Sequence, residues 1–331
     1  MIDYSDLIEQ LLQRNPRAAA KLITIVENDF EAAEQIVNKI FKYTGHAYIL
    51  GITGAPGSGK STLISTLIKL FVEDGKKIGI LAVDPTSPLT GGAILADRIR
   101  MKDNFSVKNV FIRSMANRGQ LGGLARATED AIKILDAYGC DIIIVETVGV
   151  GQSEVDICKS AQTVVTLLVP GMGDDIQAIK AGIMEITDIF AVNKMDLPGA
   201  DKKVAEIQQM LELDLNYKYE SNNYEHSDIK KSQWVPEIVK VNSKTGENFE
   251  IFLKLIQKHK NYVQNKDIFS NYQINRIRNE TLQILKYKIT KKVERLLRSN
   301  SEIEEYIKLV MSKTMDPYAM ANLIIKLLGI E

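Results

Sequence analysis

Residues 54–61 read GAPGSGKS and match the Walker A pattern, with glycines, Lys60 and Ser61 at the defining positions. The segment follows an apolar run at 48–53 and precedes a helical stretch, which is the context that phosphate binding by this motif requires. Glycines let backbone amides turn toward phosphates, and a helix N-terminus adds positive charge. We expect Lys60 to reach the β- and γ-phosphates and the Ser61 hydroxyl to bind Mg²⁺. The predicted phosphate-binding residues are Gly54, Ala55, Pro56, Gly57, Ser58, Gly59, Lys60, Ser61 and Thr62.

Three acidic residues are candidate ligands of that Mg²⁺, which prefers oxygen donors and needs one or two carboxylates beside the phosphates. Asp84 and Glu146 each follow an apolar run, at the carboxyl end of a predicted strand, where ligands bind in parallel sheets. Asp97 lies in the polar segment after Asp84. An acid in such a place also commonly caps a helix, so both interpretations stay open for Asp97.

Residues 146–149 read ETVG, which has the spacing of the Asp-x-x-Gly switch motif of GTPases with Glu in place of Asp. We expect the Gly149 amide to contact a γ-phosphate. Its loop would then become ordered with a nucleoside triphosphate and relax after hydrolysis.

Residues 193–196 read NKMD directly after the apolar run IFAV, and an Asn-Lys-x-Asp tetrad recognises guanine in GTPases. The Asp196 carboxylate would accept hydrogen bonds from the ring imino and exocyclic amino groups, which adenine cannot donate. A site built for those donors rejects ATP by roughly 10⁴–10⁵, because the carboxylate stays unmatched. The stretch VNSKTGEN at 241–248 would add a loop against the base. The predicted base-binding residues are Asn193, Lys194, Asp196, Ser243 and Lys244, the last two through their backbone amides, and GTP is favoured over ATP.

The elements that must position these residues alternate between short apolar runs and helical stretches, which predicts an α/β fold. We expect a mostly parallel central sheet flanked by helices, as in P-loop NTPases. The predicted strands are 48–53, 78–83, 110–112, 141–146, 164–169, 189–193 and 237–242. The polar and aromatic stretch 214–234 has no clear period and predicts a loop or irregular insertion.

Helical patterns precede and follow this region. Apolar residues recur at helical spacing from Ser5 to about Lys42, and Asn15-Pro16 predicts the start of a second helix there. After about Tyr262 one long helix is expected, and Asp316-Pro317 starts another. That long helix either packs on a partner or a second copy, or folds back on its own domain. We predict an N-terminal helical extension at 1–43, a P-loop GTPase domain at 44–262 and a C-terminal helical extension at 263–331.

Composition excludes several classes of protein. The 331 residues carry 42 basic and 42 acidic side chains, so we expect no broad electrostatic surface for nucleic acid. Two cysteines and three scattered histidines predict neither a disulfide scaffold nor a zinc site. The apolar runs fall far short of the ~18 residues of a membrane span, and the N-terminus does not resemble a secretory signal. We therefore predict a cytoplasmic protein with no membrane association.

Four long segments, read with the motifs above, resemble the MeaB/ArgK (MMAA-type) GTPases of the SIMIBI class of P-loop proteins. They are ETVGVGQSE at 146–154, VDPTSPLTGGAILADRIRM at 83–101, QLGGLARAT at 120–128 and PGMGDDIQAIKAGIMEI at 170–186. The resemblance covers about residues 10–260, and the helical ends also suit the family. Two mobile-loop stretches, around Ala96–Ile99 and at 114–119, depart from the family pattern without removing a ligating carboxylate.

The resemblance implies a GTPase chaperone for an adenosylcobalamin-dependent acyl-CoA mutase, usually methylmalonyl-CoA mutase, that gates cofactor loading and protects the mutase from inactivation. It places Asp84, Asp97 and Glu146 around the Mg²⁺ site. It further implies a homodimer formed through the C-terminal helices. A third mobile segment, relaying the nucleotide state to the mutase, would contain Asp174, Gln177 and Lys180.

Hydrolysis of GTP depends mainly on positioning and on neutralising charge, since the transition state spreads charge over the γ-phosphate oxygens. The candidate catalytic residues are Lys60, Gly149 and Arg100. An added cation is worth roughly 10³–10⁵ in other GTPases. Arg100, with Arg98 beside it, could supply that cation, or both could be ordinary solvated arginines. We expect slow turnover of the isolated protein and faster turnover with its partner.

Two alternative functions remain at this point. A nickel-delivery GTPase shares the fold and the switch, but it needs metal-binding His or Cys, which are sparse here. An ATP-dependent kinase or transport-accessory ATPase would share the phosphate site, and older names of family members point that way, but the guanine tetrad argues against it.

Overall fold

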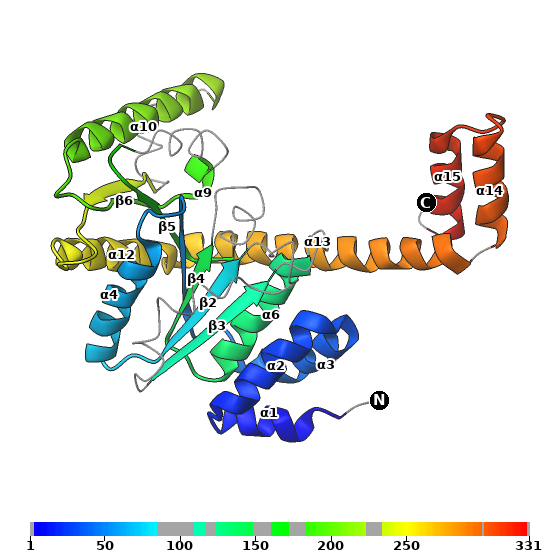
Figure 1. Ribbon diagram of the computed structural model, residues 1–331, viewed down its shortest axis with the longest axis horizontal. Helices are drawn as coiled ribbons and strands as arrows, with labels where there is room; N and C mark the ends of the chain where they lie inside the picture. The colour runs from blue at the N-terminus through cyan, green and yellow to red at the C-terminus, as the bar shows by residue number, and fades with distance from the viewer. Residues whose placement is uncertain are drawn as a thin grey trace. The chain divides into compact units, whose positions relative to one another are not determined.

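The computed structural model describes residues 3–84, 109–116, 123–147, 160–171, 183–222, 234–299 and 301–329. Within these ranges seven strands form one parallel sheet in the order β3-β2-β4-β1-β5-β6-β7 (Figure 1). The strands are β1 (Tyr48–Gly54), β2 (Ile78–Asp84), β3 (Val110–Ala116), β4 (Ile142–Thr147), β5 (Thr163–Leu168), β6 (Ile189–Val192) and β7 (Glu237–Lys240). The predicted parallel sheet is confirmed, and each predicted strand overlaps an observed one.

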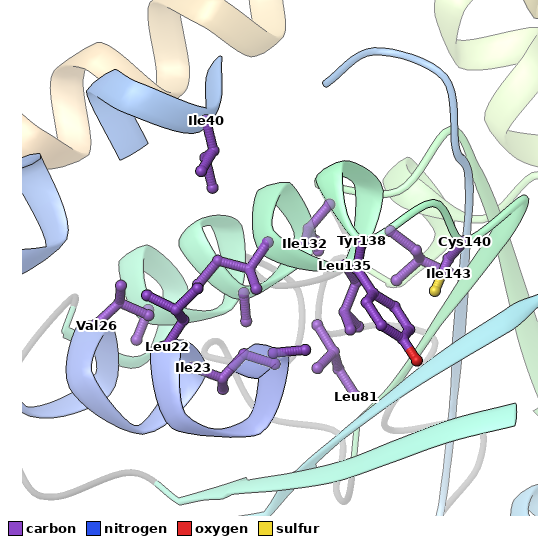
Figure 2. Packing of buried hydrophobic residues seen from close by; sticks show 14 of the residues in the cluster. Leu22, Ile23, Val26, Ile40, Leu81, Ile132, Leu135, Tyr138, Cys140 and Ile143 are labelled. Carbon is purple, nitrogen blue, oxygen red and sulfur yellow. The ribbon is translucent and has the colours of Figure 1, made fainter. Parts of the chain in front are cut away.

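Both faces of the sheet are covered by helices, because its strands are apolar on both sides. One face packs Leu81 and Ile143 against the N-terminal helices and α6 (Gly123–Ala137), as Figure 2 shows. The opposite face packs Ile80 and Ile144 against α4 (Lys60–Glu73) and α12 (Phe249–Val263). The period of two along each strand therefore divides the apolar side chains between two cores.

Three helices form the N-terminal extension: α1 (Ser5–Leu12), α2 (Pro16–Asn28) and α3 (Phe30–Ile40), followed by the short η1 (Phe41–Tyr43). The predicted cap is confirmed, because the Asn15 side chain accepts a hydrogen bond from the Arg17 amide and Pro16 is the first helical residue. The helical pattern of the sequence does not separate α3 from α2. Helix α3 begins where the Asp29 side chain accepts a hydrogen bond from the Ala32 amide.

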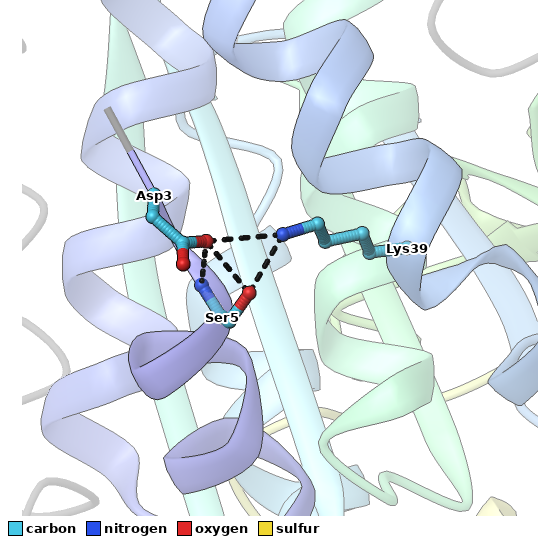
Figure 3. A network of polar contacts seen from close by, with 3 residues as sticks. All are labelled: Asp3, Ser5 and Lys39. Carbon is cyan, nitrogen blue, oxygen red and sulfur yellow. Dashed lines mark hydrogen bonds and ion pairs between the residues drawn. The ribbon is translucent and has the colours of Figure 1, made fainter. Parts of the chain in front are cut away.

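A polar network fixes the start of this extension. Lys39 Nζ donates to Asp3 Oδ1 at 3.1 Å and to Ser5 Oγ at 2.7 Å, which ties the residues before and in α1 to α3 (Figure 3). Hydrogen bonds from Ser5, with Lys39 beside them, lower the pKa of Asp3 to about 2. The network is exposed, so it orients the terminus rather than stabilising the core.

The C-terminal helices are α13 (Lys266–Ser299), α14 (Ser301–Met311) and α15 (Pro317–Leu327). The predicted start of α15 is confirmed, since Asp316 accepts from the Tyr318 and Ala319 amides. The chain divides into two compact units, 1–276 and 277–331. In the second unit, α14 and α15 contact each other.

The prediction of a loop over 214–234 is wrong in its first part. Helix α10 (Ala200–Asn222) continues through 214–222, and 223–233 lie outside the described residues. The stretch contains neither Pro nor Gly, so nothing in it ends the helix that buries Ile207 and Leu211 against β6. The lack of an apolar stripe was mistaken for a lack of helix.

A short helix, α9 (Met184–Ile186), precedes β6. No helix in the described ranges combines the length and the apolar character of a membrane span.

Candidate nucleotide-binding site

The loop 54–61 lies at the middle of the sheet, between the end of β1 and the start of α4 (Figure 1). Strand β1 is flanked by β4 on one side and β5 on the other. In the chain β1 is followed by β2, which lies on the β4 side of it, whereas β5 is followed by β6 on the other side. The strand order therefore reverses between β1 and β5, and open α/β sheets bind ligands at the carboxyl ends of the strands at such a point. The predicted phosphate segment therefore occupies the usual ligand position of its fold.

Two glycines of this loop cannot be replaced without displacing backbone or a buried amide. Gly54 has φ +144°, and a Cβ there would stand 2.3 Å from the Leu167 carbonyl oxygen. Gly59 has φ +97°, and a Cβ there would stand 2.4 Å from Asn193 Nδ2. Left-handed φ values and close approach both exclude side chains. The glycines are thus required by the geometry of the loop itself.

Lys60 is held inside the loop. Its Nζ donates to the carbonyl oxygens of Gly54 at 2.7 Å and Ala55 at 3.1 Å, and the residue is 6% exposed. The Ser58 hydroxyl is also buried and has no hydrogen-bond partner among the described residues. A buried ammonium group beside helix α4's N-terminus, with a buried hydroxyl that lacks a partner, fits a polyanionic ligand.

A carboxylate and a hydroxyl meet next to this loop. Ser61 Oγ donates to Glu146 Oε1 at 3.3 Å, and Glu146 is 1% exposed. The Thr147 hydroxyl donates to the Thr53 hydroxyl at 3.0 Å, which joins β4 to β1 near the carboxyl ends of both strands. Asp84 is the last residue of β2, which pairs with β4. The carboxyl end of β2 therefore lies beside the carboxyl end of β4. The hydroxyl and carboxylate donors fit a hard divalent cation such as Mg²⁺.

Asn193 links the phosphate loop to the segments predicted to bind the base. Its Nδ2 donates to the Ser58 carbonyl oxygen at 2.8 Å, and its Oδ1 accepts from the amide of Ser243 at 3.0 Å and the hydroxyl at 2.8 Å. The residue is 2% exposed. Thr66 of α4 adds a hydrogen bond from its hydroxyl to the Ser243 carbonyl at 2.9 Å. Three segments distant in sequence are therefore fixed around one amide.

Asp196 and Lys194 complete the tetrad at the surface. Asp196 Oδ1 accepts from Asn242 Nδ2 at 2.8 Å, and Lys194 Nζ donates to the Gly57 carbonyl at 3.2 Å. The backbone amide of Lys244, expected to face the base, donates at 3.0 Å to Asn242 Oδ1. The Ser243 amide, expected in the same role, is the one that donates to Asn193. Asn242 is a site residue that the motifs alone do not identify, although it stands directly before the predicted Ser243-Lys244 pair.

Seven candidate residues lie outside the described ranges, so the structure does not place them. They are Asp97, Arg98, Arg100, Gly149, Asp174, Gln177 and Lys180.

A second polar cluster lies at the amino ends of the strands, at the opposite end of the sheet from the phosphate loop. The Thr163 hydroxyl lies 2.6 Å from His259 Nδ1 and hydrogen-bonds to the Tyr48 hydroxyl, while His259 Nε2 lies 3.3 Å from Asp188 Oδ1. These residue types resemble a hydrolase triad, but Thr163 is 0% and His259 3% exposed. No substrate reaches a hydroxyl so deeply buried, so the cluster is structural.

The sheet, the glycine-lined loop and the buried lysine define a P-loop nucleotide-binding protein. The family model for the methylmalonyl-CoA mutase-associated GTPase MeaB matches residues 19–298, and the chain belongs to this family. It is therefore a GTPase. Within the described ranges no three His, Cys, Asp or Glu side chains gather as a metal site.

Relatives agree with this assignment. A Pyrococcus horikoshii protein is 50% identical over 326 residues, which are 98% of each chain. The GTPase ArgK of Escherichia coli is 39% identical over 59% of this chain and 61% of its own. The mitochondrial methylmalonic aciduria type A homolog of Mus musculus is 36% identical over 60% of this chain and 45% of its own.

The fold also occurs in a solved structure. A crystal structure described as an LAO/AO transport system kinase superposes with a TM-score of 0.69 over 99% of both chains, at 23% identity. At that level of identity the likeness concerns the fold alone.

Proposed function

We propose that the protein is a GTP-controlled chaperone of an adenosylcobalamin-dependent acyl-CoA mutase of the methylmalonyl-CoA mutase type. It would assist loading of the cofactor and protect the mutase from inactivation. The family's association with methylmalonyl-CoA mutase supports the choice of partner. The choice of GTP depends mainly on one hydrogen bond. Asn193 Nδ2 donates to the Ser58 carbonyl oxygen at 2.8 Å, so the predicted guanine-binding segment lies directly beside the phosphate loop.

The phosphate end would be bound by the loop 54–61 and by Thr62. Lys60 would exchange its contacts with the Gly54 and Ala55 carbonyls for phosphate oxygens, which is a short movement for a flexible ammonium group. Its charge would stabilise the negative charge that develops on the γ-phosphate.

Mg²⁺ would be held by Ser61, Glu146, Asp84 and Asp97. The Ser61–Glu146 contact supports the first two of these ligands. Bound there, the ion would neutralise charge on the β- and γ-phosphates. The carboxylate of Glu146 would either bind the ion directly or orient a water molecule bound to it.

The guanine end would be read by Asp196, with Lys194 and the loop containing Ser243 and Lys244 beside the base. Gly149 and Arg100 would act on the γ-phosphate. The segment with Asp174, Gln177 and Lys180 would transmit the nucleotide state to the mutase. Gly149, Arg100, Asp174, Gln177 and Lys180 lie outside the described ranges, and the roles of the last three rest on the family resemblance.

The functional test combines the purified protein with a methylmalonyl-CoA mutase. We expect GTP hydrolysis to rise at least tenfold when the mutase is added, and transfer of adenosylcobalamin to the mutase to require GTP. A Lys60→Ala variant, which removes the phosphate-binding charge, should lose both effects while still folding. Unchanged hydrolysis together with loading that is indifferent to GTP would disprove the chaperone function.

We further propose that the C-terminal helices form a homodimer. Apolar side chains on α13 are exposed at a spacing close to a heptad repeat, which is typical of a helix that packs on another helix. Among the described side chains of α13, the exposed large apolar residues are Ile274, Ile277, Leu282, Leu285, Ile289 and Leu297. Leu282, Leu285 and Ile289 follow the three- and four-residue spacing of such a repeat. Sedimentation of the wild type and of a Leu282→Glu/Ile289→Glu double variant should give a dimer and a monomer, respectively. A monomeric wild type at micromolar concentration would contradict this proposal.

A further inference from the structure

A hydrogen bond connects Asp196 to a residue 46 positions later in the chain. Asn242 Nδ2 donates to Asp196 Oδ1 at 2.8 Å. Asp196 itself is exposed and follows β6, whereas Asn242 is 8% exposed and follows β7. A surface carboxylate thus contacts a buried amide whose own position is fixed by the sheet.

The orientation of the Asn242 amide is determined by its other contacts. Its Oδ1 accepts from the backbone amides of Lys244 at 3.0 Å and Thr245 at 3.4 Å. Two N–H donors on one side require the oxygen there, so the NH₂ group must point to Asp196. The Asn242 backbone is held as well, since its carbonyl accepts from Gly246 and its amide donates to Glu247.

This contact leaves Asp196 the capacity that guanine recognition needs. A carboxylate offers about four lone-pair positions, and Asn242 uses one of them. The remaining positions include all of Oδ2, which is enough for the ring imino and exocyclic amino donors of guanine. Without a partner, an exposed carboxylate populates several rotamers, and fixing it on binding would cost affinity.

We propose that Asn242 is a positioning residue for guanine specificity: it pre-orients the Asp196 carboxylate through one hydrogen bond. The inference rests on the proposed role of Asp196. Asn242 need not touch the nucleotide. It acts by reducing the conformational freedom of the group that does.

The Asn242→Asp variant tests this positioning role. Aspartate keeps the oxygen that accepts hydrogen bonds from the Lys244 and Thr245 amides, so these bonds within the loop are retained. It lacks the NH₂ donor and places a second carboxylate against Asp196. Thr245→Ala is the matched control, because it changes an exposed side chain of the same loop and removes no contact to Asp196.

The measurements are equilibrium titrations with GDP and ADP, and thermal melting of the free variants. We expect Asn242→Asp to weaken GDP binding about tenfold to hundredfold, because the hydrogen bond to Asp196 is lost and a like charge faces the carboxylate. Adenine has no matching donors for the Asp196 carboxylate, so the affinity of the variant for ADP should stay within about twofold of wild type. The Thr245→Ala control should keep the wild-type ratio of the two affinities.

Each other result has a definite meaning. An unchanged GDP-to-ADP ratio in Asn242→Asp would overturn the inference. Equal losses for both nucleotides with a lower melting temperature would also overturn it, because they would show a structural role for Asn242. An Asp196→Ala variant distinguishes a failure of the proposed base site from a failure of the positioning role of Asn242. If this variant keeps its preference for guanine, the proposed base site itself fails. If it loses that preference while Asn242→Asp does not, only the positioning role fails.

Discussion

The side-chain amide of Asn193 donates to the Ser58 carbonyl oxygen at 2.8 Å, so the base-binding tetrad and the phosphate loop share a hydrogen bond. The same side chain accepts two hydrogen bonds from Ser243 through its oxygen. These bonds use the side-chain oxygen twice and one N–H of the side-chain amide, all toward the protein. They hold the two halves of the site in register.

Replacing Asn193 by Ala should weaken binding of both ends of the nucleotide. Three hydrogen bonds would be lost and the buried Ser58 and Ser243 groups left unmatched, at a cost of about 1–3 kcal/mol each. We expect GDP affinity to fall at least a hundredfold, and affinity for inorganic pyrophosphate, which has no base, to fall as well. Calorimetric titration measures both. Asn261→Ala, an exposed asparagine on α12, is the control; a pyrophosphate affinity equal to that of wild type would refute the coupling.

A Gly54→Ala substitution should abolish nucleotide binding through the backbone alone. The added Cβ would stand 2.3 Å from the Leu167 carbonyl oxygen of β5, which cannot move without breaking the sheet. Gly75 is the matched control, because it also has a positive φ, +75°, but nothing lies within 4 Å of an added Cβ. Gly75→Ala should cost about 1 kcal/mol of stability and leave GDP affinity unchanged. Equal behaviour of the two variants in binding titrations would contradict this account of the loop.

Local signals in the sequence were sufficient for most of the fold. Continuous Val and Ile runs identified the strands on which Asp84 and Glu146 stand, and Asn15-Pro16 and Asp316-Pro317 identified two helix starts. These signals work because a strand buried on both faces and a capped helix are each defined by a few adjacent residues.

The parts that were missed depend on contacts distant in sequence. Helix α10 continues past Leu213 without an apolar stripe, and periodicity alone cannot detect such a segment. The Asp196–Asn242 contact requires β6 and β7 to be neighbours, and the strand order does not follow from the apolar runs. Asn242 was therefore part of a recognised motif, but its partner could be found only in the folded chain.

The buried cluster around His259 should contribute to stability and not to GTP hydrolysis. A Thr163→Val substitution keeps the shape but removes the hydroxyl between His259 Nδ1 and Tyr48. Two buried polar groups then lose a partner, so we expect the free energy of unfolding to fall by about 1–3 kcal/mol. The rate of GTP hydrolysis, measured well below the melting temperature, should equal that of wild type. The cluster lies at the amino ends of the strands, whereas the phosphate loop follows the carboxyl end of β1. A loss of hydrolysis without a loss of stability would assign the cluster a chemical role.

Cys140 should make the protein less stable at alkaline pH. Burial raises the pKa of its thiol from 9.0 to about 12, and the nearby Lys77 ammonium opposes this only in part. Between these values the unfolded chain loses a proton that the folded chain retains, so stability falls as pH rises above about 9. At pH 10 the loss from this group is roughly 1.4 kcal/mol, because one pKa unit corresponds to 1.36 kcal/mol.

Urea unfolding at pH 8 and pH 10 tests this sign. Both proteins compared carry Cys158→Ser, so that one thiol remains, and one of them also carries Cys140→Ala. The stability advantage of the protein that keeps Cys140 over the protein with Cys140→Ala should fall by about 1–1.5 kcal/mol from pH 8 to pH 10. Iodoacetamide should label Cys140 in urea and not in the folded protein, since the thiolate is the reactive form. Rapid labelling of the folded protein at pH 8 would show that the thiol is neither buried nor raised in pKa.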